Sequence, residues 1–151
     1  RHARAVAALV DSAATRLGLD PDERETVRLA AELHEAGRLM LPSGSNANDV
    51  ALAGERMLAA TPALAPAAHL IGALHEHWDG SGLPHGRAGE EIPLGARIVA
   101  VADALEVMSA DRTPTEALAE LQRGAGAQYD PKVVAAFTAT ASPQAVPFVL
   151  S

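Results

Sequence analysis

The sequence predicts an all-α protein, a single helical domain of six or seven helices. Three observations lead to this prediction. Apolar residues recur three and four positions apart over most of the chain, which is the spacing of one helix face. Two segments, Asp20–Glu23 and Thr113–Glu116, have a capping residue, a proline and a glutamate in the order that begins a helix. No stretch alternates apolar and polar residues as a half-buried strand does.

The expected helices are delimited by residues that start or stop helical backbone. Gly18 closes the first helix, Pro21 opens the second, and Gly37 suits its C-terminal end. Residues 78–92 are rich in glycine and proline and are predicted to form a loop. The helices are therefore expected at about residues 1–17, 21–36, 49–60, 64–77, 93–109, 114–123 and 131–140.

Composition restricts the classes of function. The 151 residues are enough for one domain with its own core, and the net charge of -7 argues against binding to a nucleic-acid polymer. The chain has no cysteine, which excludes disulfides and thiolate metal sites, and no apolar run of about 20 residues that would span a membrane. We expect a cytoplasmic protein with a domain at 1–141, whose N-terminus is truncated, and a tail at 142–151.

Residue types that bind metals interrupt the apolar helix faces. Because side chains three, four and seven apart share a face, these residues converge inside the bundle if the faces pack together. They are His2, His34 with Glu35, His75 and Asp103. Neutral imidazoles and carboxylates together suit a divalent transition metal such as iron, manganese, nickel or zinc. The alternative is that each histidine is simply a packed, hydrogen-bonded core residue.

Asp103 gives the strongest argument for a cation. It lies in the apolar stretch IVAVAD, where burial of an unpaired carboxylate is unfavourable by several kcal/mol. Either a cation lies beside Asp103 or this helix face is not buried.

Longer motifs resemble a known family. HEHWDGSGLP at 75–84, followed by GEEIPLGARIVAVAD at 89–103, is similar to the signature region of HD-GYP domains, which belong to the HD phosphohydrolase superfamily. RHARAVAAL resembles the first helix of that family, LAAELHEAGRLMLP its His-Asp segment, and EALAELQRGAGAQYDPKVVAAF its closing helices. The resemblance covers nearly all of the chain except about the last ten residues.

The resemblance implies a helical fold with two or three metal ions, often iron, that hydrolyses cyclic di-GMP or related cyclic dinucleotides. It assigns Arg38, the basic residue after the His-Asp position, to catalysis and Arg112 to a substrate phosphate. The metal ligands that it implies are His2, His34, Glu35, His75 and Asp103. Implied partners are a cyclic dinucleotide or another small phosphate ester, and a protein partner or fused signalling domain.

The chain departs from the family pattern at several positions. The pair is His34-Glu35 instead of His-Asp, and Leu74 and Val50 stand where the family has histidines. The loop motif reads Gly82-Leu83-Pro84, without its tyrosine. The sequence therefore predicts a degenerate member with fewer metal ions than the family, in which one ion could remain on His2, His34, Glu35 and Asp103.

Two functions follow from these departures. In the first, catalysis is reduced or lost and the domain is regulatory in bacterial signalling. In the second, the domain is an active metal-dependent phosphohydrolase on cyclic di-GMP or another phosphate ester.

His77 and His85 are offset from the family positions, and we expect them to be exposed loop residues.

Overall fold

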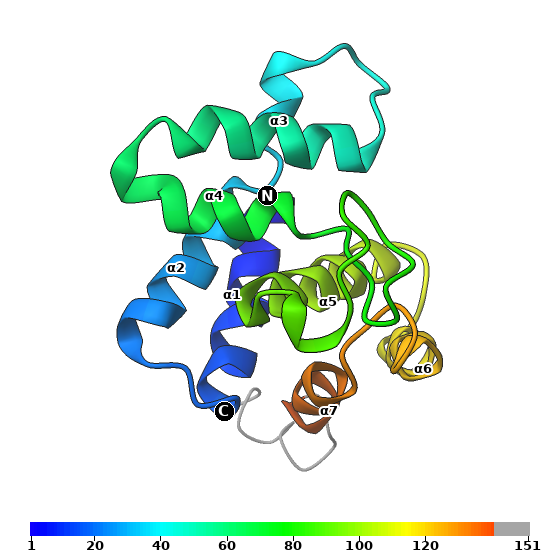
Figure 1. Cartoon of the computed structure of the whole chain (residues 1–151). Helices are drawn as coiled ribbons and strands as arrows, with labels where there is room; N and C mark the ends of the chain where they lie inside the picture. The colour runs from blue at the N-terminus through cyan, green and yellow to red at the C-terminus, as the bar shows by residue number, and fades with distance from the viewer. Residues whose placement is uncertain (141–151) are drawn as a thin grey trace.

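The computed structural model describes residues 1–140, and within this part of the chain it confirms the all-α prediction. The described residues form seven α-helices and three 3-10 helices, with isolated bridges as their only β pairing (Figure 1). The expected tail at 142–151 lies outside the described residues. The α-helices are α1 (His2–Arg16), α2 (Pro21–Leu33), α3 (Ala47–Ala59), α4 (Ala65–Gly72), α5 (Leu94–Met108), α6 (Pro114–Gly124) and α7 (Pro131–Thr140). The 3-10 helices are η1 (Ala36–Met40), η2 (Pro62–Leu64) and η3 (Gly89–Glu91).

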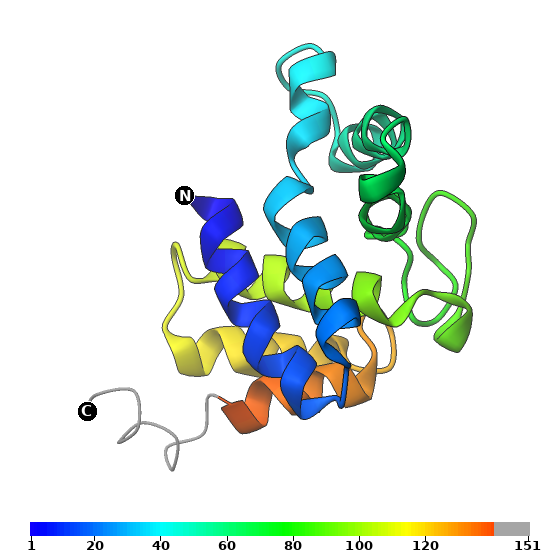
Figure 2. The same ribbon diagram turned by 90° about the vertical axis from the view of Figure 1, so that its left-hand side faces the viewer.

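The core lies where α1, α2 and α5 pack against one another. In both views α1 and α2 run side by side and α5 crosses them, while α3 and α4 form a tier above and α6 and α7 lie at the base (Figures 1 and 2). Small and β-branched side chains fill the contact, which lets the helices approach closely; Val6, Val10, Ala30, Ile98 and Val99 are fully buried. This packing brings the start of α1, the end of α2 and the middle of α5 together.

The predicted helix starts are confirmed. The side chain of Asp20 accepts a hydrogen bond from the backbone of Glu23, and the side chain of Glu23 accepts one from Asp20 in return. Thr113 and Glu116 form the same reciprocal pair at the start of α6. Each pair satisfies two backbone N–H groups that have no partner within the helix. None of the helices in residues 1–140 has the length and apolar character that a membrane crossing requires.

The expected helix to residue 77 is too long. α4 ends at Gly72, and the amides of Ala73 and Leu74 donate to carbonyls three residues back, at 3.1 and 3.2 Å. Such bonds tighten the last turn and end the helix. His75 therefore lies in the connection after α4 and not on the apolar stripe of a helix.

Gly37 does not end α2 as expected. α2 ends at Leu33 with His34 as its C-cap, and Gly37 lies within η1. A Cβ atom on Gly37 would lie 1.9 Å from the carbonyl oxygen of Val50 and 2.7 Å from the amide nitrogen of Gly54. Glycine is required here because the backbones of η1 and α3 are in direct contact.

Gly37→Ala is expected to lower the free energy of unfolding by about 3 kcal/mol, because backbone must move to admit the methyl group. Chemical denaturation followed by circular dichroism measures this loss. Gly44→Ala is the matched control: its Cβ position has nothing within 4 Å, and only its φ of 86° opposes the substitution. The control is expected to lose about 1 kcal/mol. Equal losses in the two variants would contradict the steric argument.

Candidate metal centre and adjacent cavity

Asp103, in the middle of α5, joins two of the histidines. Its Oδ1 atom lies 2.8 Å from Nε2 of His2 and 3.2 Å from Nε2 of His34. His2 is the first residue of α1, and His34 is buried at the C-terminal end of α2. The two imidazole rings meet edge to face, with centroids 5.4 Å apart. Three segments distant in sequence thus place nitrogen and carboxylate donors at one point.

The orientation of His34 requires a cation at this point. Its Nδ1 lies 2.6 Å from the carbonyl oxygen of Ala31 and donates to it, so in the neutral ring Nε2 carries a lone pair. That lone pair faces Asp103 Oδ1, and two lone pairs attract only when a proton or a metal ion lies between them. Metal-bound histidines usually donate their other ring N–H to a carbonyl or carboxylate in this way.

The directions of the pKa shifts of His34 and Asp103 are those of a site that favours positive charge. Burial alone would lower the pKa of His34, but the hydrogen bonds with Asp103 and Ala31 and the charges of Asp103 and Glu35 outweigh it and raise the pKa. Burial would raise the pKa of Asp103, but the hydrogen bonds and charges of His34 and His2 lower it. A metal ion bound here would compete with a proton for Nε2 of His34.

The donor geometry fits one metal ion. The described residues contain one group of metal-ligand side chains whose donor atoms all lie within 4.8 Å of one another, and it consists of His2, His34 and Glu35. Asp103 is not a member of this group, but its Oδ1 lies 2.8 and 3.2 Å from Nε2 of the same two histidines. An ion about 2.1 Å from each ligand atom places neighbouring ligand atoms about 3.0–3.4 Å apart, which is close to these distances. These side chains would therefore hold a single divalent transition metal.

Glu35 is shared between this group and Arg38. Its Oε1 lies 3.7 Å from His34 Nε2, while its Oε2 accepts a hydrogen bond from Nε of Arg38. Arg38 lies on η1 and is exposed. Arg38 therefore holds Oε2 of Glu35, while Oε1 remains available to a metal ion.

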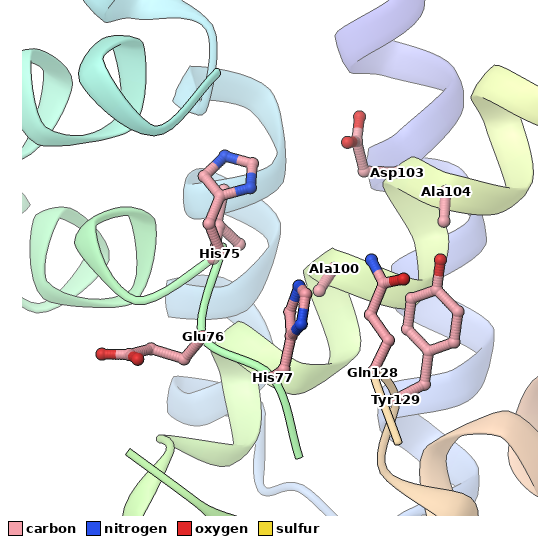
Figure 3. A pocket seen from close by; sticks show the side chains of 9 residues that line it. His75, Glu76, His77, Ala100, Asp103, Ala104, Gln128 and Tyr129 are labelled. Atoms are coloured by element: carbon pink, nitrogen blue, oxygen red, sulfur yellow. The ribbon is translucent and has the colours of Figure 1, made fainter. Parts of the chain in front are cut away.

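A cavity of about 150 Å³ lies on the other side of Asp103. One wall is the connection after α4, with His75 and His77, and the opposite wall is the segment before α7, with Gln128 and Tyr129 (Figure 3). His75 contributes to this cavity and not to the donor group around His34. Burial lowers the pKa of His75, and the neighbouring His77 and His34 act in the same direction against the charge of Asp103.

Hydrogen bonds join the two walls. The amide of Trp78 donates to the carbonyl of Gln128 at 3.1 Å, and the amide of Asp79 donates to the carbonyl of Ala127 at 2.9 Å. Behind them the guanidinium of Arg97 lies over the ring of Trp78, 5.7 Å from its centre, and Nη1 of Arg97 is 2.6 Å from Oδ2 of the buried Asp130. The cavity therefore has a defined shape, with both walls fixed to α5.

Both histidines lie in the loop as expected, but the predicted exposure is confirmed for His85 and wrong for His77. His77 is partly buried and lines the cavity, because the walls fold over it, and His85 is exposed. Glu76, between His75 and His77, points away from the cavity in Figure 3. It accepts hydrogen bonds from the amides of His85 and Arg87, both at 3.1 Å, and thereby holds the glycine-rich loop.

Arg112 lies apart from the cavity wall. It occupies the exposed turn between α5 and α6 and is not among the side chains that line the cavity.

Sequence reasoning missed Gln128 and Tyr129, although the start signal Asp130-Pro131 follows them directly. That signal locates the helix start, but it gives no indication that the preceding residues fold against His77.

Comparison with known proteins identifies the family. The family model described as "HD domain" matches residues 45–133, more than half of the chain. The chain is 35% identical over 142 residues to the cyclic di-GMP phosphodiesterase response regulator RpfG of Xanthomonas campestris, and the match covers 80% of this chain and 38% of RpfG. It is 32% identical over 158 residues to a cyclic di-GMP phosphodiesterase of Thermotoga maritima, and this match covers 91% of this chain and 43% of that protein.

Solved structures share the fold. A cyclic GMP-AMP-specific phosphodiesterase of Vibrio cholerae, V-cGAP3, superposes with a TM-score of 0.82 at 21% identity, over 99% of this chain and 46% of that one. Bd1817, an HDG"Y"P protein of Bdellovibrio bacteriovorus, superposes with a TM-score of 0.73 at 19% identity, over 91% of this chain and 50% of that one. The chain spans less than half the length of the two curated relatives. The chain belongs to the HD-domain family and is related to the phosphodiesterases of cyclic di-GMP and cyclic GMP-AMP.

Proposed function

We propose that this chain is a degenerate HD-GYP-type domain with a reduced metal centre, in which hydrolysis of cyclic dinucleotides is reduced or lost. Its role is then regulatory in bacterial signalling, through a protein partner or a fused domain. The observation that carries the proposal is the single compact donor group of His2, His34 and Glu35 among the described residues, with Asp103 beside both histidines. A second and a third ion have too few ligands among the described residues.

The aliphatic residues at the two lost positions support this conclusion. Leu74 lines the cavity beside His75, with 7% of its surface exposed. Val50 is 4% exposed and packs in α3. Neither side chain has a lone pair to donate to a metal. Asp103 is the carboxylate whose charge acts on His75, and one carboxylate with one imidazole gives too few donors for a tightly held ion.

The residues that remain could bind and polarise a phosphate ester. When bound, a divalent ion neutralises charge on phosphoryl oxygens and lowers the pKa of its water ligand. His2, His34, Glu35 and Asp103 would hold this ion. Arg38 balances the charge of Glu35, and Arg112, on the exposed turn after α5, would contact parts of a substrate that lie outside the cavity.

The alternative is an active phosphohydrolase on cyclic di-GMP or another phosphate ester. The cavity favours it, because a hollow with polar walls directly beside the donor group is where a substrate phosphate would meet the ion. One ion with an activated water can suffice for hydrolysis.

Metal content and turnover distinguish the two functions. We expect protein purified without chelator to hold about one equivalent of iron, manganese, nickel or zinc, and not to hydrolyse cyclic di-GMP supplied with any of these metals. Elemental analysis and chromatography of the nucleotide products measure both quantities. Turnover with one equivalent would establish the alternative, and two or more tightly held equivalents would contradict the reduced centre.

A further inference from the structure

We propose that residues 146–150, which read VPFVL, dock into an apolar groove between α6 and α7 and cover the outer face of α7. This inference goes beyond the proposed function, because it concerns a surface and a segment that neither the metal centre nor the cavity beside it uses. It gives the groove one occupant, the chain's own C-terminal segment.

The groove is the larger of two apolar hollows on the domain. Its volume is about 480 Å³, and α6 and α7, which form it, lie at the base of the domain (Figures 1 and 2). Most of its lining is apolar, with Ala125, Pro131, Val134, Ala135 and Ala139. No charged side chain is among the described residues that line it. Because water gains little from contact with such a surface, an apolar segment that fills the groove is favoured.

The helix α7 is apolar on both of its faces. Phe137 lies in the core with 3% of its surface exposed. Pro131, Ala135 and Ala139, each four residues from the next, are exposed on the other face. Lys132 is the only charged residue in the sequence of α7. A helix with one solvated face normally carries charged and polar residues there, whereas a helix that is apolar all round is covered.

The sequence after α7 has the character that such a groove requires. Residues 141–151, which lie outside the described part of the chain, read ASPQAVPFVLS and contain no charged side chain. The run at 146–150 includes Phe148, one of the two phenylalanines of the whole chain. Segments that remain solvated are rich in charged residues and poor in aromatic and β-branched ones. We therefore expect this run to be buried against the domain.

The spacing of the run matches that of the helix. Two residues of extended chain advance about 6.8 Å, and one turn of α7, four residues, advances about 6 Å. If the chain returns antiparallel to α7, positions 146, 148 and 150 follow Ala139, Ala135 and Pro131 in turn. The five residues at 141–145 span up to about 17 Å, which is enough to turn the chain back onto its own helix.

The small side chains of the groove favour this occupant over a second copy of the chain. The same face of a second copy would offer only Ala135, Ala139 and Pro131 to the groove, and these side chains would fill it poorly. Phe148 supplies the bulk that they lack, since aromatic side chains bury about 150–250 Å² each.

Thermal unfolding of the full chain tests this inference. Phe148→Ala should lower the midpoint by about 5 °C, because a large aromatic side chain no longer leaves water on folding. Ala135→Glu, which introduces a charge into the groove, should lower the midpoint by a similar amount in the wild-type background. It should have little further effect in the Phe148→Ala background, because substitutions at two residues in contact are not additive.

Two matched controls show whether these losses belong to the groove. Gln144→Ala changes the C-terminal segment outside the apolar run. Ala59→Glu makes the same change as in the groove at an exposed alanine of α3, in the tier away from α7. Each control should shift the midpoint by less than about 1 °C, and the loss from Ala59→Glu should be the same with and without Phe148→Ala.

Three results would overturn the assignment. The first is an unchanged midpoint in Phe148→Ala, and the second is losses from Phe148→Ala and Ala135→Glu that simply add. The third is a wild-type dimer, measured by light scattering, that Phe148→Ala dissociates, because a second copy would then occupy the groove. Metal content should be equal in all these proteins, since none of the changes removes a metal donor. Two or more ions in the wild type would contradict the reduced centre but not the groove assignment.

Discussion

Replacement of Asp103 by asparagine is expected to remove the metal ion while the protein remains folded. The substitution keeps the size of the side chain but removes the negative charge that Oδ1 presents to both His2 and His34. An amide oxygen is a much weaker ligand for a transition metal than a carboxylate oxygen. We expect metal affinity to fall by at least about 100-fold, since loss of a residue that only supports a ligand already costs about 10–100-fold.

The measurement is the metal content of protein purified without chelator, with circular dichroism as the check on folding. Asp111→Asn is the matched control, because it makes the same change of charge on the exposed turn after α5. The control should hold as much metal as the wild type. An Asp103→Asn protein that retains its ion would show that Asp103 is not a ligand.

Restoring the lost donors should enlarge the metal centre. Leu74→His places an imidazole on the cavity wall beside His75 and opposite Asp103, and Glu35→Asp shortens the carboxylate that Arg38 now holds. We expect the double variant to bind about two equivalents of transition metal and to hydrolyse cyclic di-GMP at a measurable rate. Two metal ions clamp both the attacking and the leaving oxygen of a phosphoryl transfer, which a single ion does less well.

Leu70→His provides the comparison for this gain. Leu70 is also buried on the α4 side of the core, but it lines a different pocket, with Val27 and Leu94, away from Asp103. A histidine there should destabilise the fold without raising metal content. If the double variant gains neither metal nor activity although it folds, the account of a degenerate centre with an otherwise intact pocket is wrong.

The helical architecture could be predicted because its signals are local. The capping pairs at Asp20 and Thr113 determine where α2 and α6 begin, and each pair lies within four residues of sequence. The end of α4 could not be predicted in this way. The carboxylate of Glu55 lies against Gly72, where a Cβ atom would come within 2.3 Å of it, and this contact comes from another helix.

The candidate site follows the same division between local and non-local information. The apolar stripes and the family resemblance indicated His2, His34 and Asp103, because a charged or ligand-type residue on an apolar face is visible in the sequence itself. His77, Gln128 and Tyr129 were not predicted as one site, since their proximity depends on hydrogen bonds between segments about 50 residues apart, such as that from Trp78 to Gln128. The order of residues along the chain contains no periodic signal for that contact.

The central claim is that three helices bring His2, His34 and Asp103 to one ion. A crystal structure of protein purified without chelator, with anomalous diffraction recorded at the metal absorption edges, tests it most directly. Our account predicts one anomalous peak between His34 Nε2 and Asp103 Oδ1, with ligand distances of about 2.0–2.3 Å. A map with no anomalous peak there, or with water at hydrogen-bonding distance in its place, would contradict it.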